Sequence, residues 1–107
     1  MGIPQIKEYD VPMGPCLTRR ELPWQLAPRR AALLIHDMQN YFLSRYESAA
    51  FVRNLCVNVD SIRKKCHELR VPVFYTGQPA NQSKQQRGLL LDFWGAVKGL
   101  SGMAVGY

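Results

Sequence analysis

Residues 31–35 read AALLI, a continuous apolar run between the basic pair Arg29-Arg30 and the polar pair His36-Asp37. A run this short is typical of a β-strand buried on both faces, as in a parallel sheet, and it is too short for a buried helix. We therefore predict a strand over residues 31–35.

A helix is predicted downstream, where the spacing of the apolar residues changes. Between residues 49 and 69 they recur at spacings of 4, 4, 3, 4 and 3, which is one face of an α-helix. These residues are Phe51, Leu55, Val59, Ile62, Cys66 and Leu69. Arg70 ends the helix, and VPVFY at residues 71–75 predicts a second strand, with its proline tolerated near the start. Strand, helix and strand form a βαβ unit, whose two strands are expected to be parallel neighbours with a right-handed crossover.

The flanking segments are less regular. Residues 1–30 hold five of the seven prolines and predict an extended arm that wraps the domain, with Trp24 as its anchor. After the second strand we expect a turn at residues 77–79, a polar loop at 81–86 and a short helix at 88–94. The stretch 95–107 holds four of the eight glycines and specifies neither helix nor strand. The predicted organisation is an arm (1–30), an α/β unit (31–95) and a glycine-rich tail (96–107).

Composition narrows the class of protein. A chain of 107 residues forms one small domain at most, and no apolar run approaches the ~20 residues that span a bilayer. No secretory signal is evident, and three cysteines without metal-ligand spacing predict reduced thiols in a cytoplasmic protein. The net charge of +6 suggests nucleic-acid binding as one hypothesis. The basic residues are dispersed along the sequence, however, and this favours a solvated surface. We expect no nucleic-acid or membrane partner, and a basic protein attracts a small anionic substrate.

The predicted topology brings two polar residues together. Asp37 closes the first strand and Gln78 follows the second, and parallel strands end at the same edge of a sheet, where ligands bind in open α/β folds. Asp37 is either a general acid or base, or the N-cap of the turn that follows it. His36 is expected to point to the opposite face of its strand and to be structural.

The remaining candidates have two readings each. Arg87 either binds a substrate carboxylate through its planar guanidinium group or is a surface arginine. Four aromatic residues line a pocket or fill a core: Tyr41, Phe42, Phe93 and Trp94. The sequence lacks a serine nucleophile elbow, a glycine-rich phosphate loop and metal-ligand spacing, and Cys56 and Cys66 fall in the predicted helix.

Three segments resemble the isochorismatase family. LLIHDMQNYF at residues 33–42 is similar to the family's LLIHDMQxYF, and VPVFYTGQP at 71–79 is similar to IPVxYTAQP. RGLLLDFWG at residues 87–95 is similar to RGLLxDFWG. The motifs occur in the family's order, so the resemblance covers residues 2 to about 95. It implies an α/β fold, namely the N-terminal half of a three-layer parallel-sheet domain.

The resemblance also implies a reaction and roles. Isochorismatases cleave the enolpyruvyl ether of isochorismate, or of 2-amino-2-deoxyisochorismate, to release pyruvate in siderophore or phenazine biosynthesis. Asp37 matches the catalytic acid, and a protonated carboxyl group is favoured by an apolar setting. Gln78 and Arg87 match substrate-binding residues, and Phe42 matches a pocket aromatic. No metal and no organic cofactor is implied.

The chain departs from the family after Gly95. Family members continue with roughly another hundred residues, as befits a typical domain size, and these supply further strands and an active-site lysine. Here residues 96–100 read AVKGL, and Lys98 cannot be equated with that lysine. Three hypotheses follow: a truncated isochorismatase-type enzyme, an inactive fragment of an interrupted gene, or a non-catalytic interaction module. A half-sheet with uncovered faces would also favour pairing with another copy, so a homo-oligomer is left open.

Overall fold

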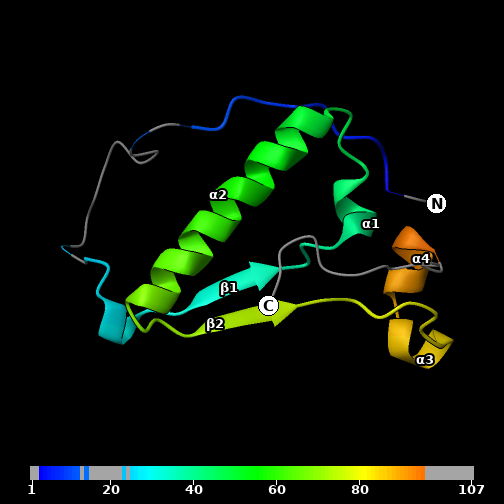
Figure 1. Cartoon of the computed structure of the whole chain (residues 1–107). Helices are drawn as coiled ribbons and strands as arrows, with labels where there is room; N and C mark the ends of the chain where they lie inside the picture. The colour runs from blue at the N-terminus through cyan, green and yellow to red at the C-terminus, as the bar shows by residue number, and fades with distance from the viewer. Residues whose placement is uncertain (1–2, 13, 15–22, 24, 96–107) are drawn as a thin grey trace.

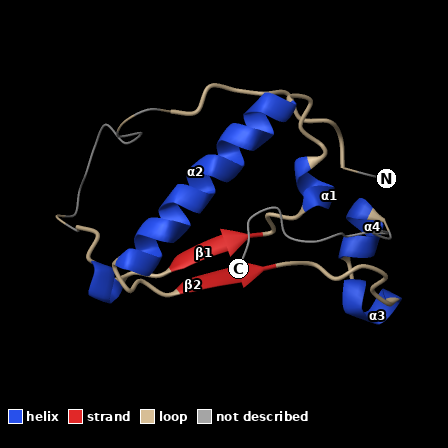
Figure 2. Ribbon diagram, in the orientation of Figure 1, coloured by secondary structure: helices blue, strands red, loops and turns tan. Residues whose placement is uncertain are grey.

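The protein is a mixed α/β unit built around a two-stranded parallel sheet, as a computed structural model shows (Figures 1 and 2). The structure describes residues 3–12, 14, 23 and 25–95. Its elements follow a 3-10 turn at Pro28–Arg30 in this order: β1 (Leu33–His36), α1 (Asn40–Leu43), α2 (Ala49–Glu68), β2 (Val73–Thr76), α3 (Lys84–Arg87) and α4 (Leu90–Trp94). Helix α2 lies across one face of the sheet, and α1, α3 and α4 gather beyond the ends toward which both strands point (Figure 1).

The two strands pair in parallel, as predicted, with Leu34 opposite Phe74 and Ile35 opposite Tyr75. Both strands begin two residues later than expected. Pro72 has no N–H to donate to the neighbouring strand, although its carbonyl accepts a hydrogen bond from Leu33 N at 2.9 Å, and strand β2 starts at Val73. The predicted right-handed crossover stays a prediction.

Helix α2 confirms the predicted helix to within one residue. Ser48 caps its first turn, because its hydroxyl oxygen accepts a hydrogen bond from Phe51 N at 3.1 Å. Its 20 residues extend about 30 Å, whereas each four-residue strand extends about 13 Å. The helix is therefore longer than the sheet that it covers. Part of its apolar face stays exposed, including Ile62 and the C-cap residue Leu69.

The buried core is small. Among the described residues, four apolar side chains are buried, namely Ile35, Leu43, Phe51 and Val71. They lie on β1, on α1, on α2 and just before β2. The core thus fixes α2 against the sheet and places α1 at the strand ends.

The described part of the N-terminal arm runs along the link between α1 and α2. Ile6 forms an isolated bridge with Tyr46, supported by Ile6 N to Arg45 O at 2.7 Å and Glu47 N to Ile6 O at 3.0 Å. Tyr9 then packs edge-on against Phe51, with ring centroids 4.9 Å apart. The predicted anchor Trp24 and the predicted tail 96–107 lie outside the described residues.

Three local expectations are wrong. The polar loop expected at residues 81–86 contains helix α3, which starts with a capping box between Ser83 and Gln86. The turn expected at 77–79 falls at Ala80-Asn81, where Asn81 takes a left-handed φ of 57°. The segment after Asp37 forms the short helix α1 rather than a turn, whereas α4 confirms the predicted short helix.

A cluster of charged residues on α2 predicts a pH-dependent contribution to stability. Asp60 Oδ1 accepts from Arg63 Nη2 at 2.7 Å, and Asp60 Oδ2 pairs with Lys64 Nζ at 2.9 Å. The hydrogen bonds from Lys64 and then Arg63 hold the pKa of the Asp60 carboxyl below its usual range. A lowered pKa contributes stability above the unfolded-state pKa of about 3.9, and that stability is lost as the pH falls through the lowered value.

Asp60→Asn is therefore expected to lower the urea midpoint at neutral pH and to match the wild type in acid. The measurement is the difference between the two midpoints at neutral pH and at a pH below the lowered pKa of Asp60. Because the group is exposed, the difference is expected to be small. A difference that stays constant with pH would contradict this account.

Candidate active site

Asp37 leaves the strand geometry immediately after β1. Its φ is 49°, a left-handed conformation that is uncommon for residues other than glycine, asparagine and aspartate. Its backbone N–H lies 3.2 Å from Thr76 O and 3.0 Å from Thr76 Oγ1, and its carbonyl accepts from Gln39 N at 2.8 Å. The N-cap alternative is wrong, because Gln39 is the N-cap residue of α1.

The carboxyl group of Asp37 has a polar neighbour at each oxygen. Thr76 Oγ1 donates to Oδ1 at 2.9 Å, and Gln78 Nε2 approaches Oδ2 at 3.4 Å. The side chain is 19% exposed. The topology argument is confirmed for this pair, since residues 41 positions apart meet at one edge of the sheet. The surroundings described here are more polar than the apolar setting expected from the resemblance.

Gln78 links this carboxyl group to a buried cation. Its side-chain Oε1 accepts from Arg87 Nη1 at 2.7 Å, and Arg87 is only 6% exposed. Arg87 is therefore not a surface arginine. Its Nε also faces Gly95 O at 3.4 Å, but no carboxylate among the described residues forms an ion pair with it. A buried guanidinium group that has only neutral acceptors is suited to an anionic ligand.

A cavity of about 230 Å³ opens beside this guanidinium group. Five of its lining residues are apolar or aromatic, namely Ile3, Tyr41, Phe42, Leu90 and Trp94, and the polar ones are Gln78 and Arg87. Of the four aromatic residues predicted to line a pocket or fill a core, Tyr41, Phe42 and Trp94 line this cavity. Phe93 does not line it and is 65% exposed. Asp37 does not line the cavity, but its carboxyl group is contacted by Gln78, which does.

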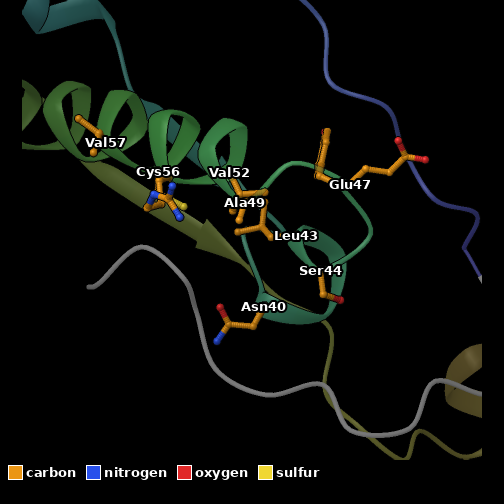
Figure 3. A pocket seen from close by; sticks show the side chains of 10 residues that line it. Asn40, Leu43, Ser44, Glu47, Ala49, Val52, Cys56 and Val57 are labelled. Carbon is orange, nitrogen blue, oxygen red and sulfur yellow. The ribbon is translucent and has the colours of Figure 1, made fainter.

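A larger hollow of about 780 Å³ lies between α1 and the first half of α2 (Figure 3). None of the predicted site residues lines it. Cys56 does, and burial raises the pKa of its thiol, which favours the uncharged form over a nucleophilic thiolate. The predicted site residues therefore lie at the strand ends and outside this larger hollow. Among the described residues, no group of three His, Cys, Asp or Glu could hold a metal ion.

Gln39 was not singled out from the sequence, yet it organises the site. It is 6% exposed, its Nε2 donates to Gln78 O at 2.9 Å, and its Oε1 accepts from Gln78 N at 2.7 Å. These bonds continue the pairing of β1 and β2 past the strands and fix the backbone of Gln78. Thr76 was also missed, although it ends β2 at the same edge that selected Gln78.

Gln39→Met tests this clamp, because methionine has a similar size but cannot form the two hydrogen bonds. Two backbone groups of Gln78 would lose their partners, so we expect a loss of about 1–3 kcal/mol in the free energy of unfolding. The matched control is Gln85→Met on the exposed face of α3, where a change within about 0.5 kcal/mol is expected. Equal effects of the two substitutions in urea denaturation would refute the clamp.

The fold and the site together define a class of protein. Ligands of open α/β folds bind where parallel strands end, and here that edge carries a carboxyl group, an amide and a buried guanidinium group. Such an edge is suited to a small anionic ligand. Among the described residues, no helix is long and apolar enough to cross a membrane.

Comparison with known proteins finds several similar proteins. The chain is 42% identical over 96 residues to "Isochorismatase" of Bacillus subtilis and 40% identical over 96 residues to "Enterobactin synthase component B" of Escherichia coli, in both cases over 89% of its length. It is 45% identical to "Phenazine biosynthesis protein PhzD1" of Pseudomonas aeruginosa over 88% of its length. The predicted resemblance to isochorismatases is thus confirmed. No protein-family model matches the chain.

The match covers only part of each relative. The chain spans 31% of the Bacillus protein, 34% of the Escherichia protein and 45% of the Pseudomonas protein. The similarity therefore holds for the matched residues and does not carry the activity of the whole relatives over to this chain.

Proposed function

We propose that the site at the ends of β1 and β2 serves an isochorismatase-type hydrolysis, the cleavage of an enolpyruvyl ether with release of pyruvate. The observation that carries the proposal is the continuous line from the Asp37 carboxyl through the Gln78 amide to the buried Arg87 guanidinium. The line has a proton donor at one end and an anion-binding group at the other. The substrate of this reaction needs both, since it carries carboxylates and is activated by protonation.

Asp37 is proposed as the acid. In its protonated form it gives a proton to the terminal methylene carbon of the enolpyruvyl group, and the neighbouring carbon becomes an oxocarbenium ion. Water adds to that carbon and releases one proton to the solvent, and the resulting hemiketal collapses to pyruvate and a cyclohexadiene acid that keeps the ether oxygen as a hydroxyl group. One water is consumed for each ether bond broken, and no metal or cofactor takes part in the proposal.

The other residues are proposed to bind and orient the substrate. Arg87 would hold a substrate carboxylate through its planar guanidinium group, and Gln78 would hold the substrate close to Asp37. Phe42 lines the cavity, packs edge-on against Tyr41 with centroids 5.3 Å apart, and would contact the ring of the substrate. Both isochorismate and 2-amino-2-deoxyisochorismate meet these requirements, in siderophore and phenazine biosynthesis respectively.

The organisation into an arm (1–30), an α/β unit (31–95) and a tail (96–107) remains part of the proposal. So does the three-layer architecture of the complete domain.

A non-catalytic interaction module is the second candidate, and one observation favours it. Leu34 on β1 and Phe74 on β2 are paired in the strand register, and each is 58% exposed. An apolar sheet face of this kind favours association with another protein surface, including a second copy of the chain. Analytical ultracentrifugation of wild type and a Leu34→Thr variant distinguishes association through this face from a monomer.

The test of the enzymatic proposal is pyruvate release from isochorismate by the purified chain, coupled to NADH oxidation by lactate dehydrogenase. The control substrate is the saturated lactyl ether, which has no double bond to protonate and is expected to give no signal. Release from isochorismate alone supports the proposal. A folded chain that binds isochorismate without releasing pyruvate would favour a binding role, and a chain that does neither would overturn the proposal.

A further inference from the structure

His36 does not lie where strand alternation would place it. Consecutive residues of a strand point to opposite faces, so His36 was expected to point away from Asp37. The left-handed φ of Asp37 breaks this alternation, and the two side chains come together at Thr76. The expectation that His36 points away is therefore wrong.

Thr76 Oγ1 is the centre of a short chain of hydrogen bonds. It lies 2.7 Å from His36 Nδ1 and 2.9 Å from Asp37 Oδ1, and it accepts the backbone N–H of Asp37 at 3.0 Å. A hydroxyl group has one proton and two lone pairs. When that proton points to an ionised Asp37, the remaining lone pair faces His36, so His36 must carry its proton on Nδ1.

The same chain can move a proton. The direct separation of His36 Nε2 and Asp37 Oδ2 is 3.7 Å, too long for a hydrogen bond, whereas both steps through Thr76 are shorter than 3.0 Å. The His36 side chain is 71% exposed, so its ring reaches solvent. Among the described residues, Asp37 is the charged group within ion-pair distance of that ring.

We propose that His36 and Thr76 form a proton relay that reloads Asp37 from solvent after each turnover. This inference rests on the proposed function, because only an acid that loses its proton in every cycle needs reloading. Protonated His36 gives its Nδ1 proton to Thr76 Oγ1, while Thr76 gives its hydroxyl proton to Asp37 Oδ1. One proton leaves the imidazolium and one reaches the carboxylate. The imidazole is then neutral, with its remaining proton on Nε2. Because the side chain is 71% exposed, the ring can turn toward solvent, where Nδ1 takes up a proton from water before the imidazolium returns to Thr76.

In this arrangement His36 and Thr76 act through Asp37 and do not touch the substrate. Their loss is expected to lower kcat and leave KM unchanged, because substrate binding depends on Gln78 and Arg87. Gln78 contacts the other carboxyl oxygen of Asp37, so substitutions at His36 or Thr76 leave that contact in place.

The first test needs no activity. The two histidines of the chain, His36 and His67, are labelled with ¹⁵N, and their neutral tautomers are read from long-range ¹H–¹⁵N couplings. His67→Gln assigns the signals and is a matched control, since His67 is exposed on α2. We expect the Nδ1–H tautomer for His36 in the wild type and its loss in Thr76→Val. With Asp37 ionised, an Nε2–H tautomer of His36 in the folded wild type would overturn the relay even if no pyruvate were released.

The second test is kinetic. His36→Gln and Thr76→Val are expected to lower kcat for pyruvate release at least about tenfold with unchanged KM. Thr76→Ser keeps the hydroxyl group and is expected to keep kcat, and added imidazole is expected to restore His36→Gln but not Thr76→Val. Loss of activity in Thr76→Ser equal to that in Thr76→Val, or unchanged kcat in His36→Gln, would overturn the proposal. Absence of release by the wild type would instead count against the proposed function, with the tautomer still deciding the geometry.

Discussion

Asp37→Asn is expected to reduce pyruvate release by about 10²- to 10⁴-fold, the contribution usually made by a positioned general acid. Asparagine has the shape of aspartate but no acidic proton to give to the enolpyruvyl carbon. Its amide can still accept from Thr76 Oγ1 through its oxygen, so the contact with β2 is kept. The loss of rate would therefore report on the proton alone.

The fold is expected to survive this substitution for a reason that lies in the backbone. Asp37 has a φ of 49°, and asparagine is among the few residues that adopt left-handed conformations readily. The free energy of unfolding is thus expected to change by no more than about 0.5 kcal/mol. Asp37→Ala is the contrasting variant, because alanine loses the hydrogen bond from Thr76 and tolerates this φ less well.

The measurement pairs the pyruvate assay with urea denaturation of both variants. A variant Asp37→Asn that is folded and as active as the wild type would show that another group supplies the proton. A variant that is unfolded would show that the carboxylate is a structural group at this edge of the sheet.

The fold was predictable to the extent that it depends on local patterns. The apolar run at 31–35, the helical spacing over 49–69 and the run at 71–75 identify the βαβ unit, and the parallel pairing follows from that topology. The strand ends were less predictable, because Pro72 delays the ladder and its effect depends on which strand lies beside it. Helix α3 carried a readable signal in Ser83 and Gln86, but its polar sequence has no apolar face to confirm it.

The candidate site shows a sharper division. The meeting of Asp37 and Gln78 follows from topology alone, since both come after parallel strands. The cluster around Thr76 does not follow from topology. It depends on the left-handed φ of Asp37 itself, which brings the Asp37 side chain toward His36. The burial of Arg87 was also beyond sequence patterns, because α3 and α4 must fold back to the strand ends before its guanidinium group can reach Gln78.

Arg87→Met is expected to weaken the binding of anionic ligands strongly while leaving stability unchanged or increased. The guanidinium group is buried and has only the neutral acceptors Gln78 Oε1 and Gly95 O among the described residues. A buried charge without an opposite charge is costly, so an apolar side chain of similar length relieves that cost. Removing one partner of a buried ion pair with a ligand costs about 2–5 kcal/mol, which corresponds to a roughly 30- to 4,000-fold weaker dissociation constant.

A substitution that leaves or increases the free energy of unfolding but weakens ligand binding identifies a side chain whose main role is to bind the ligand. Both are read from thermal unfolding with and without 2,3-dihydroxybenzoate as a carboxylate probe, because a ligand that binds only the folded state raises the melting temperature. Arg87→Lys is the matched control: it keeps the charge but not the planar pair of donors, and an intermediate shift is expected. If Arg87→Met instead lost more than about 3 kcal/mol of stability, the hydrogen bonds to Gln78 and Gly95 would be its main role, as expected when a buried network is broken. If the probe stabilised Arg87→Met as much as the wild type, the anion would bind elsewhere, and the line from Asp37 to Arg87 would lose its proposed binding end.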